Sequence, residues 1–194
     1  MSEETLRLAV IIGSSRVGRT GPAVARWFVE EAESCAMYDV DVLDLADVEL
    51  PLSLTREPGD TASAELLASV AERLGSADAF VVITPEYNHS FTAPMKNLID
   101  WHRAEWQAKP VAFVSYGGLS GGLRAVEQLR LVFAELHAAT IRDTVSFHGV
   151  WQHIGEDGVL RAPDAAVPAK VMLEKLQWWA SALKDARTTR PYAA

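Results

Sequence analysis

Three loops rich in glycine, serine and polar side chains could together bind one ligand that carries an anion and a flat ring. They span residues 13–21 (GSSRVGRTG), 84–90 (TPEYNHS) and 115–122 (SYGGLSGG). Each follows an apolar run and precedes a helical pattern, so each is expected to join a strand to a helix. In an open parallel sheet such loops lie at the carboxyl edge, where ligands bind. The sequence therefore predicts a single site to which all three loops contribute.

The first loop has the features of a phosphate-binding turn. Because it opens a predicted helix, its backbone N–H groups and the helix dipole would favour an anion. The side chains that add donors are Ser14, Ser15, Arg16, Arg19 and Thr20. Residues 13–20 also come close to the triphosphate-binding P-loop, which has lysine at the position of Arg19. A planar guanidinium does not simply replace a compact ammonium, so a nucleotide triphosphatase remains an alternative, as does an ordinary solvated turn.

The second loop could bind a planar ring. Tyr87 could cover the ring while the backbone amides of Glu86, Tyr87 and Asn88 bond to its heteroatoms. The alternative is an ordinary loop that leads into a helix, with Thr92 as the N-cap and Pro94 in the first turn.

The third loop would let the main chain approach a ligand closely. It has four glycines in the six residues from 117 to 122, and glycine carries no Cβ that could clash with a ligand. Gly117 and Gly118 are best placed for this contact. The alternative is a flexible turn whose later glycines start the next helix.

The remaining histidines and tryptophans do not indicate a second chemical site. The histidines outside these loops are His102, His137, His148 and His153. They lack the spacing of metal ligands, and no G-x-S-x-G elbow accompanies a Ser-His-Asp set. We therefore predict no metal site and no hydrolase. Trp101, Trp106 and Trp151 are interpreted as core residues or subunit contacts, not as ligand platforms.

Five runs predict the sheet that positions the loops. The runs at 8–12, 79–83 and 111–114 are continuously apolar, as expected of inner strands that helices cover on both faces. The runs at 38–42 and 144–147 alternate polar with apolar residues, which is typical of edge strands. Helical patterns separate the runs, so we predict a parallel sheet with right-handed crossovers. The predicted fold class is α/β, a flavodoxin-like three-layer sandwich with helices on both faces and strand order 2-1-3-4-5.

Length, charge and cysteine content limit the architecture and the partners. The chain has 194 residues, 49% of them hydrophobic, so we predict a single domain over 1–194 with a loose tail at 188–194. The net charge is −8 without a dense Lys/Arg run, which argues against a nucleic acid or an acidic membrane as partner. Cys35 is the only cysteine, and no apolar run is long enough for a signal or a membrane span. These features predict a cytoplasmic protein.

Taken together, the three motifs resemble the NADPH-dependent FMN reductase family of flavodoxin-like proteins, which includes small quinone, azo-dye and chromate reductases. The resemblance covers residues 6–151. Its most specific part is residues 85–90 with the segment 96–101 (KNLIDW) that follows them. The first and third loops support it.

The resemblance implies an FMN site made from the same loops. For the phosphate it implies Ser14, Arg16, Gly18, Arg19 and Thr20. For the isoalloxazine and the ribityl chain it implies Pro85, Glu86, Tyr87 and Asn88, and for the pyrimidine edge Ser115, Tyr116, Gly117 and Gly118. Some relatives have a serine and an asparagine where this chain has Arg19 and Gly21, so the phosphate contacts can differ.

The implied activity is a ping-pong reaction. NADPH or NADH gives a hydride to flavin N5, and a flavin, quinone or similar small acceptor then takes the electrons. The flavin carries this chemistry, so no side chain is expected to be catalytic, and His89 is interpreted as a polar loop residue. The resemblance also implies a homodimer or homotetramer. A flavodoxin-type electron carrier and a reductase dedicated to one pathway partner are the alternatives.

Overall fold

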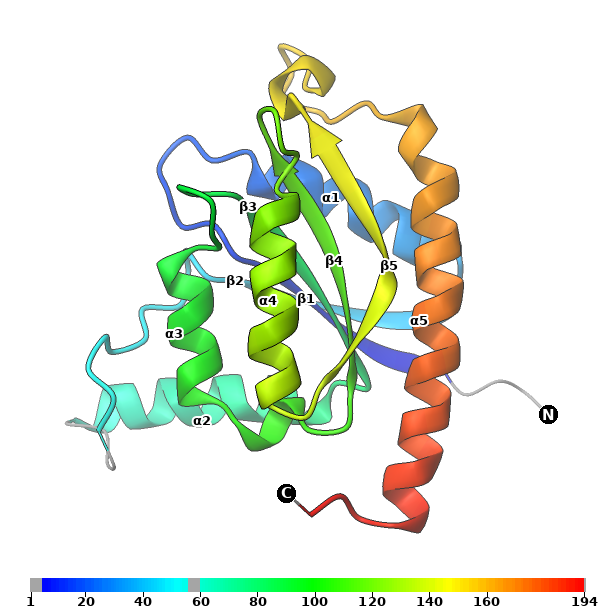
Figure 1. The fold of residues 1–194 in the computed structure, drawn as a ribbon. Helices are drawn as coiled ribbons and strands as arrows, with labels where there is room; N and C mark the ends of the chain where they lie inside the picture. The colour runs from blue at the N-terminus through cyan, green and yellow to red at the C-terminus, as the bar shows by residue number, and fades with distance from the viewer. Residues whose placement is uncertain (1–4, 56–59, 194) are drawn as a thin grey trace.

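A computed structural model describes residues 5–55 and 60–193, which form a five-stranded parallel sheet between two layers of helices (Figure 1). In chain order the elements are β1 (Leu6–Ile12), α1 (Gly21–Ser34), β2 (Tyr38–Asp44), α2 (Thr61–Ser76), β3 (Ala79–Pro85), α3 (Ala93–Trp101), η1 (Ala104–Trp106), β4 (Pro110–Gly117), α4 (Leu123–Glu135), β5 (Ala139–His148), η2 (Val150–His153) and α5 (Pro163–Thr189). The strand order β2-β1-β3-β4-β5 confirms the predicted flavodoxin-like arrangement.

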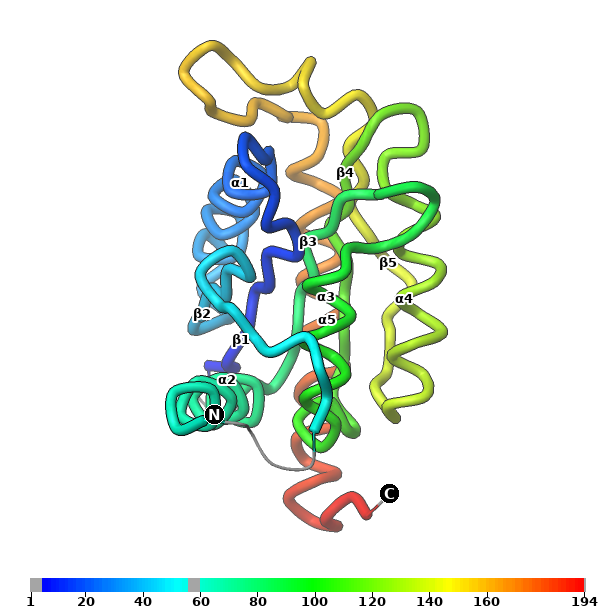
Figure 2. Tube along the Cα trace, turned by 90° about the vertical axis from the view of Figure 1, so that its left-hand side faces the viewer, coloured from blue at the N-terminus to red at the C-terminus, as the bar shows by residue number. Residues whose placement is uncertain are grey.

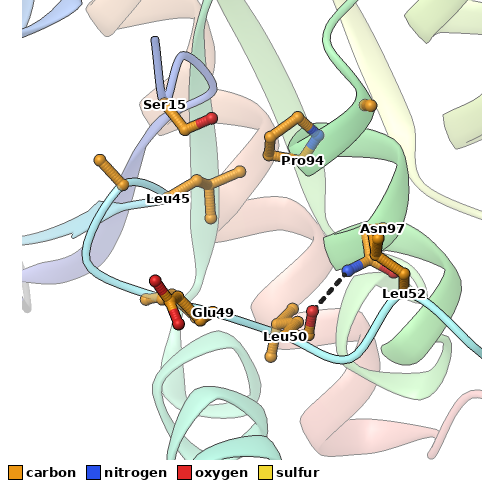
Figure 3. Close-up of a pocket in the computed structure, with 10 residues that line it drawn as sticks. Ser15, Leu45, Glu49, Leu50, Leu52, Pro94 and Asn97 are labelled. Atoms are coloured by element: carbon orange, nitrogen blue, oxygen red, sulfur yellow. Dashed lines mark hydrogen bonds between the residues drawn. The ribbon is translucent and has the colours of Figure 1, made fainter. Parts of the chain in front are cut away.

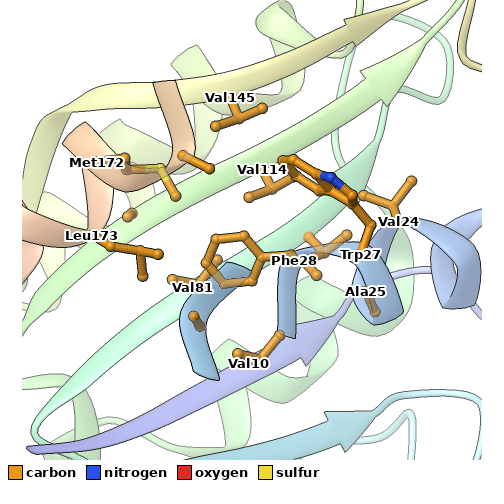
Figure 4. Close-up of a cluster of buried hydrophobic side chains, with 14 of the residues drawn as sticks. Val10, Val24, Ala25, Trp27, Phe28, Val81, Val114, Val145, Met172 and Leu173 are labelled. Carbon is orange, nitrogen blue, oxygen red and sulfur yellow. The ribbon is translucent and has the colours of Figure 1, made fainter. Parts of the chain in front are cut away.

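Residues of the inner strands alternate between two hydrophobic cores, one on each face of the sheet. Val10 of β1 lies in the core beneath α1 and α5, whereas its neighbour Ile11 lies in the core beneath α2, α3 and α4. Figure 4 shows the first core, where Val81 of β3 lies near Phe28 of α1 and Leu173 of α5. Because both faces of β1, β3 and β4 are dry, these strands have continuously apolar sequences.

The register of the strands brings the three loops to one end of the molecule. Ile12 at the end of β1 pairs with Ile83 of β3, and Pro85 at the end of β3 pairs with Tyr116 of β4. The loops that follow β1, β3 and β4 therefore leave the sheet at neighbouring positions. Two perpendicular views show them at the same end (Figure 1 and Figure 2).

Both edge strands are longer than their alternating runs indicate. β5 begins at Ala139, and its pairing with β4 shifts register between Val111 and Phe113. β2 continues to Asp44, which pairs with Ile12. The extra residues of β2 matter because they bring the Asp44 carboxylate to the carboxyl edge of the sheet.

Helix α5 continues two residues into the segment that was expected to be a loose tail. It includes Thr188 and Thr189, whose hydroxyls donate to main-chain carbonyls one turn earlier. Beyond the helix, the Tyr192 hydroxyl lies 2.8 Å from Nδ1 of His137. Although α5 has 27 residues, no helix within 5–55 or 60–193 is long and apolar enough to cross a membrane.

Candidate functional site

The first loop starts at a fixed junction at Gly13. Its N–H donates to Ile83 O of β3 over 2.9 Å, and its carbonyl accepts a hydrogen bond from Thr92 Oγ1. The same hydroxyl caps α3 by accepting from Met95 N over 3.3 Å, which confirms the predicted N-cap. A Cβ at position 13 would lie 3.3 Å from Ile83 O, so the close approach of β1 to β3 favours glycine here.

Beyond Gly13, the loop turns its main chain toward solvent. Residues 15–18 are exposed, and within the described part of the chain their N–H groups have no acceptor of good geometry. Gly18 has a φ of 69° and no atom within 4 Å of a Cβ built at its position. Helix α1 begins at Gly21, so the positive end of its dipole lies next to these free donors. The arrangement suits a phosphate.

Arg19 lies against the protein and not toward this anion-binding space. Its Nη2 donates to Asp44 Oδ2 over 2.7 Å, and its Nη1 bonds both Asp44 Oδ1 and the carbonyl of Ser14. Both charged side chains are only 17% exposed, and the hydrogen bond to Asp44 raises the pKa of Arg19. The guanidinium expected at the phosphate therefore ties the loop to β2. Arg16, which is exposed and has no ion pair among the described residues, is the arginine that remains free.

Beneath the loop lies the Tyr116 hydroxyl, which is buried and has no hydrogen bond of good geometry within the described ranges. Burial raises the pKa of Tyr116 to about 12, against a smaller opposite effect of Ser14 and Thr20 nearby. A Cβ at Gly21 would lie 2.9 Å from Tyr116 Oη, so the hydroxyl fills the space that glycine leaves. Unpaired buried hydroxyls are rare, and this one lies fully buried beside Ser14 and Thr20 at the base of the first loop.

The second loop is a tight two-residue turn. Tyr87 and Ser90 exchange two main-chain hydrogen bonds of 2.9 and 3.1 Å. The central residues Asn88 and His89 have φ values of 50° and 73°, as a type I′ turn requires, and both residue types tolerate this region. The turn brings the Tyr87 hydroxyl to 3.1 Å from Ser14 Oγ of the first loop. The aromatic ring predicted to cover a ligand thus borders the first loop.

The Glu86 side chain joins the second loop to the third. Ser120 Oγ donates to Glu86 Oε2 over 2.6 Å, and Arg124 Nη1 donates to Oε1 over 3.0 Å. The Glu86 side chain is 8% exposed, and burial alone would raise its pKa. The hydrogen bonds from Ser120 and Arg124 outweigh burial and lower the pKa of Glu86 below its ordinary value. Glu86 therefore presents only its main chain to a ligand.

Helix α4 also holds the turn of the second loop. Gln128 Nε2 donates to the carbonyl of His89 over 2.6 Å, and Ser90 Oγ donates to Gln128 Oε1 over 2.6 Å. One amide side chain thus satisfies two groups of the turn, and the turn is fixed relative to α4.

The third loop uses its later glycines to close on itself. Gly122 has a φ of 84°, and a Cβ there would lie 2.8 Å from Ser115 Cβ. Ser115 is fully buried and its hydroxyl donates to Gly121 O over 2.8 Å, so its side chain does not reach a ligand. Gly117 and Gly118 are partly exposed and offer main chain at the edge of the sheet.

A pocket of about 430 Å³ lies beside the first loop, between the segment after β2 and helix α3 (Figure 3). Its lining residues are Ser15, Leu45, Ala46, Val48, Glu49, Leu50, Leu52, Ala93, Pro94 and Asn97. Asn97 Nδ2 donates to Leu50 O over 3.2 Å and holds its two walls together. Among the residues that the structure describes, no three potential metal ligands gather in one place.

A family model described as NADPH-dependent FMN reductase matches residues 6–152. The chain belongs to this family. It is 37% identical over 124 residues to an NAD(P)H-dependent FMN reductase of Schizosaccharomyces pombe, a match that covers 61% of each chain. It is 34% identical over 157 residues to a quinone reductase of Escherichia coli K12, with 77% of this chain and 81% of that one covered.

A solved structure shares the fold. The flavoenzyme NAD(P)H:(acceptor) oxidoreductase FerB from Paracoccus denitrificans superposes with a TM-score of 0.70 at 21% identity, over 92% of this chain and 98% of that one. The family match and the two relatives above, not this likeness of fold, show that the chain is an oxidoreductase of the FMN reductase and quinone reductase type.

The structure places the residues predicted from the family resemblance at one edge, but several of their side chains turn inward. Ser14 and Tyr116 are only 1% and 3% exposed. Arg19 bonds to Asp44, Glu86 bonds to the third loop, and Ser115 bonds within its own loop. Sequence analysis missed Asp44 because β2 was expected to end earlier. It also missed Gln128, for which no motif gives a signal.

We expect Glu86→Gln to loosen the contact between the second and third loops. At pH 7 the variant should be less stable by about 1 kcal/mol, because charge-assisted bonds are replaced by neutral ones and Arg124 is partly solvated. The folded pKa of Glu86 is lowered, so its stabilisation is present above the unfolded pKa of about 4.3 and is lost as the pH falls through the folded pKa. Urea unfolding at pH 7 and at pH 3 should show the difference shrinking at low pH.

The matched control is Glu127→Gln, which changes an exposed glutamate on α4, the helix that carries Arg124. It should leave the free energy of unfolding within about 0.5 kcal/mol of the unmodified protein. A Glu86→Gln defect of equal size at both pH values would contradict the role assigned to the carboxylate.

Proposed function

We propose that this protein is a cytoplasmic oxidoreductase that binds FMN at the carboxyl edge of its sheet and passes electrons from NAD(P)H to a small acceptor. The observation that carries the proposal is the open row of N–H groups at residues 15–18 beside the start of α1. The phosphate of FMN offers acceptors for these N–H groups.

Each loop would hold one part of the cofactor. We assign the phosphate to Ser14, Arg16, Gly18 and Thr20, with Arg19 positioning the loop through Asp44. We assign the ring and ribityl chain to Pro85, Tyr87 and Asn88 with the main chain of Glu86. We assign the pyrimidine edge to Tyr116, Gly117 and Gly118 with the main chain of Ser115.

FMN, when bound, supplies the redox chemistry, since its N5 accepts a hydride from NADPH or NADH and an acceptor then takes the two electrons in a ping-pong sequence. The chain orients the ring and places main-chain donors where negative charge develops. His89 lies exposed at the tip of the turn, and we assign it no proton transfer. The name of the Escherichia coli relative, a quinone reductase, supports a quinone as the acceptor.

The proposal is tested with purified protein that has been reconstituted with FMN and desalted. We expect flavin absorption to be retained and to bleach on anaerobic addition of NADPH or NADH, then to return when a naphthoquinone is added. Bound flavin that neither nucleotide reduces would contradict the proposal and favour a flavodoxin-type electron carrier. Loss of all flavin on desalting would contradict a resident cofactor.

Substitution of Arg16 tests the phosphate assignment. We expect Arg16→Ala to weaken FMN binding by roughly 1.5 to 3 kcal/mol, because it removes a charge-assisted hydrogen bond to the phosphate. Fluorescence titration with FMN measures the change. Arg142→Ala, which removes an exposed arginine on β5, is the matched control and should leave the affinity unaltered. Equal affinities of the two variants for FMN would contradict the assignment.

We further propose that the chain forms a homodimer or homotetramer. Leu52, which lines the pocket of Figure 3, is 86% exposed, and Leu54, two residues later, is 54% exposed. Large apolar side chains that are exposed close together in the chain would lose solvent contact at a subunit interface. Light scattering after size exclusion should give two or four times the mass of one chain. A monomer at micromolar concentration would contradict this proposal.

A further inference from the structure

Trp151, in η2 after β5, holds an exposed indole beside the third loop. It is 61% exposed, so it is not a core residue, whereas Trp106 is fully buried as expected. The alternative interpretation of Trp151 as a subunit contact stays a prediction. A Cβ built at Gly118 would lie 3.3 Å from Trp151 Cη2 and 3.9 Å from Cζ3. The outer edge of the indole therefore lies against Gly118, and much of the ring remains open to solvent.

The segment before Trp151 is fixed to the third loop by hydrogen bonds. Gly149 N donates to Gly118 O over 3.0 Å, and Ser146 Oγ donates to Gly121 O over 2.8 Å. His148 Nδ1 lies 2.9 Å from the carbonyl of the residue after Gly118. In Figure 1 this segment, drawn in gold, lies at the same end of the sheet as the third loop. Trp151 is thus carried by a firmly held turn at the rim of the proposed site.

Tryptophan is the side chain that offers the largest flat apolar face, and such faces attract other flat rings by offset or edge-to-face stacking. Gly118 has no side chain, so nothing at that position separates the indole from a ligand that lies along the main chain of the third loop. The bonds from Gly149 and Ser146 hold the turn that carries the ring before a ligand arrives, which lowers the entropy lost on binding. The position thus combines a stacking surface with a preorganised support.

We propose that Trp151 forms one wall of the acceptor subsite and selects planar aromatic acceptors, such as naphthoquinones, by stacking. This inference rests on the proposed function, because it places the flavin ring along Gly117 and Gly118. NAD(P)H also carries phosphates and riboses that can anchor it elsewhere. A quinone has only its ring and two oxygens, so stacking supplies a larger share of its binding.

The experiment compares Trp151→Ala, Trp151→Phe and Trp178→Ala in the FMN-loaded protein. Trp178 is the matched control, since it is 65% exposed but lies on α5, more than three turns beyond the start of that helix. For Trp151→Ala we expect kcat/KM for a naphthoquinone to fall about two- to tenfold. Trp151→Phe should recover most of the loss. The KM for NADPH, the affinity for FMN and turnover with ferricyanide, which has no ring to stack, should change less than twofold.

Several results would overturn the inference. An equal loss with ferricyanide, or weaker FMN binding, would make Trp151 a support of the flavin site. A change in the mass of the assembly would make it a subunit contact, and an equal effect of Trp178→Ala would make the loss non-specific. Unaltered quinone kinetics in Trp151→Ala, with an active unmodified enzyme, would overturn this inference alone. An unmodified protein without reducible flavin would instead overturn the proposed function and this inference with it.

Discussion

The two hydrogen bonds at Gly13 set the position of the whole carboxyl edge. One joins the end of β1 to Ile83 of β3, and the other joins it to Thr92, which also caps α3. Thr92 is 1% exposed, so without its hydroxyl the Gly13 carbonyl would lose a buried partner that water does not readily replace. A residue without a side chain therefore aligns the first loop, the end of β3 and the first turn of α3.

Around that junction, the polar side chains of the loops are mostly satisfied by other parts of the protein. Arg19 bonds to Asp44, Glu86 to Ser120 and Arg124, and the turn at 87–90 to α4. What the edge then offers to a ligand is chiefly main chain, with Arg16 and the ring of Tyr87. Donors that are already fixed need little reorganisation when a ligand binds. The same contacts fix the three loops relative to one another.

The parts of this structure that follow from local rules could be predicted from sequence. The apolar runs of β1, β3 and β4 give the strand order, and Thr92 with Pro94 gives the start of α3. The partners of Arg19 and Glu86 could not be predicted, because Asp44 lies 25 residues from Arg19, and Arg124 lies 38 residues from Glu86. Such pairs depend on strand register and loop direction, which a motif does not encode. The exposed position of Trp151 depends in the same way on how the turn after β5 bonds to the third loop.

Arg19 also separates this loop from the triphosphate-binding P-loop that its spacing resembles. A lysine ammonium is a point charge on a flexible stem, and it can follow a phosphate. A guanidinium is planar and can donate two parallel hydrogen bonds to a carboxylate. Here it donates them to Asp44, at the end of the neighbouring strand β2. In this pair the Arg19 guanidinium is no longer free to follow a phosphate. It instead holds the main chain of the loop through the carbonyl of Ser14. The charge left for an anion at this loop is that of the helix dipole and Arg16, with N–H and hydroxyl groups as neutral donors. This modest charge suits a single phosphate group better than a triphosphate with its metal ion.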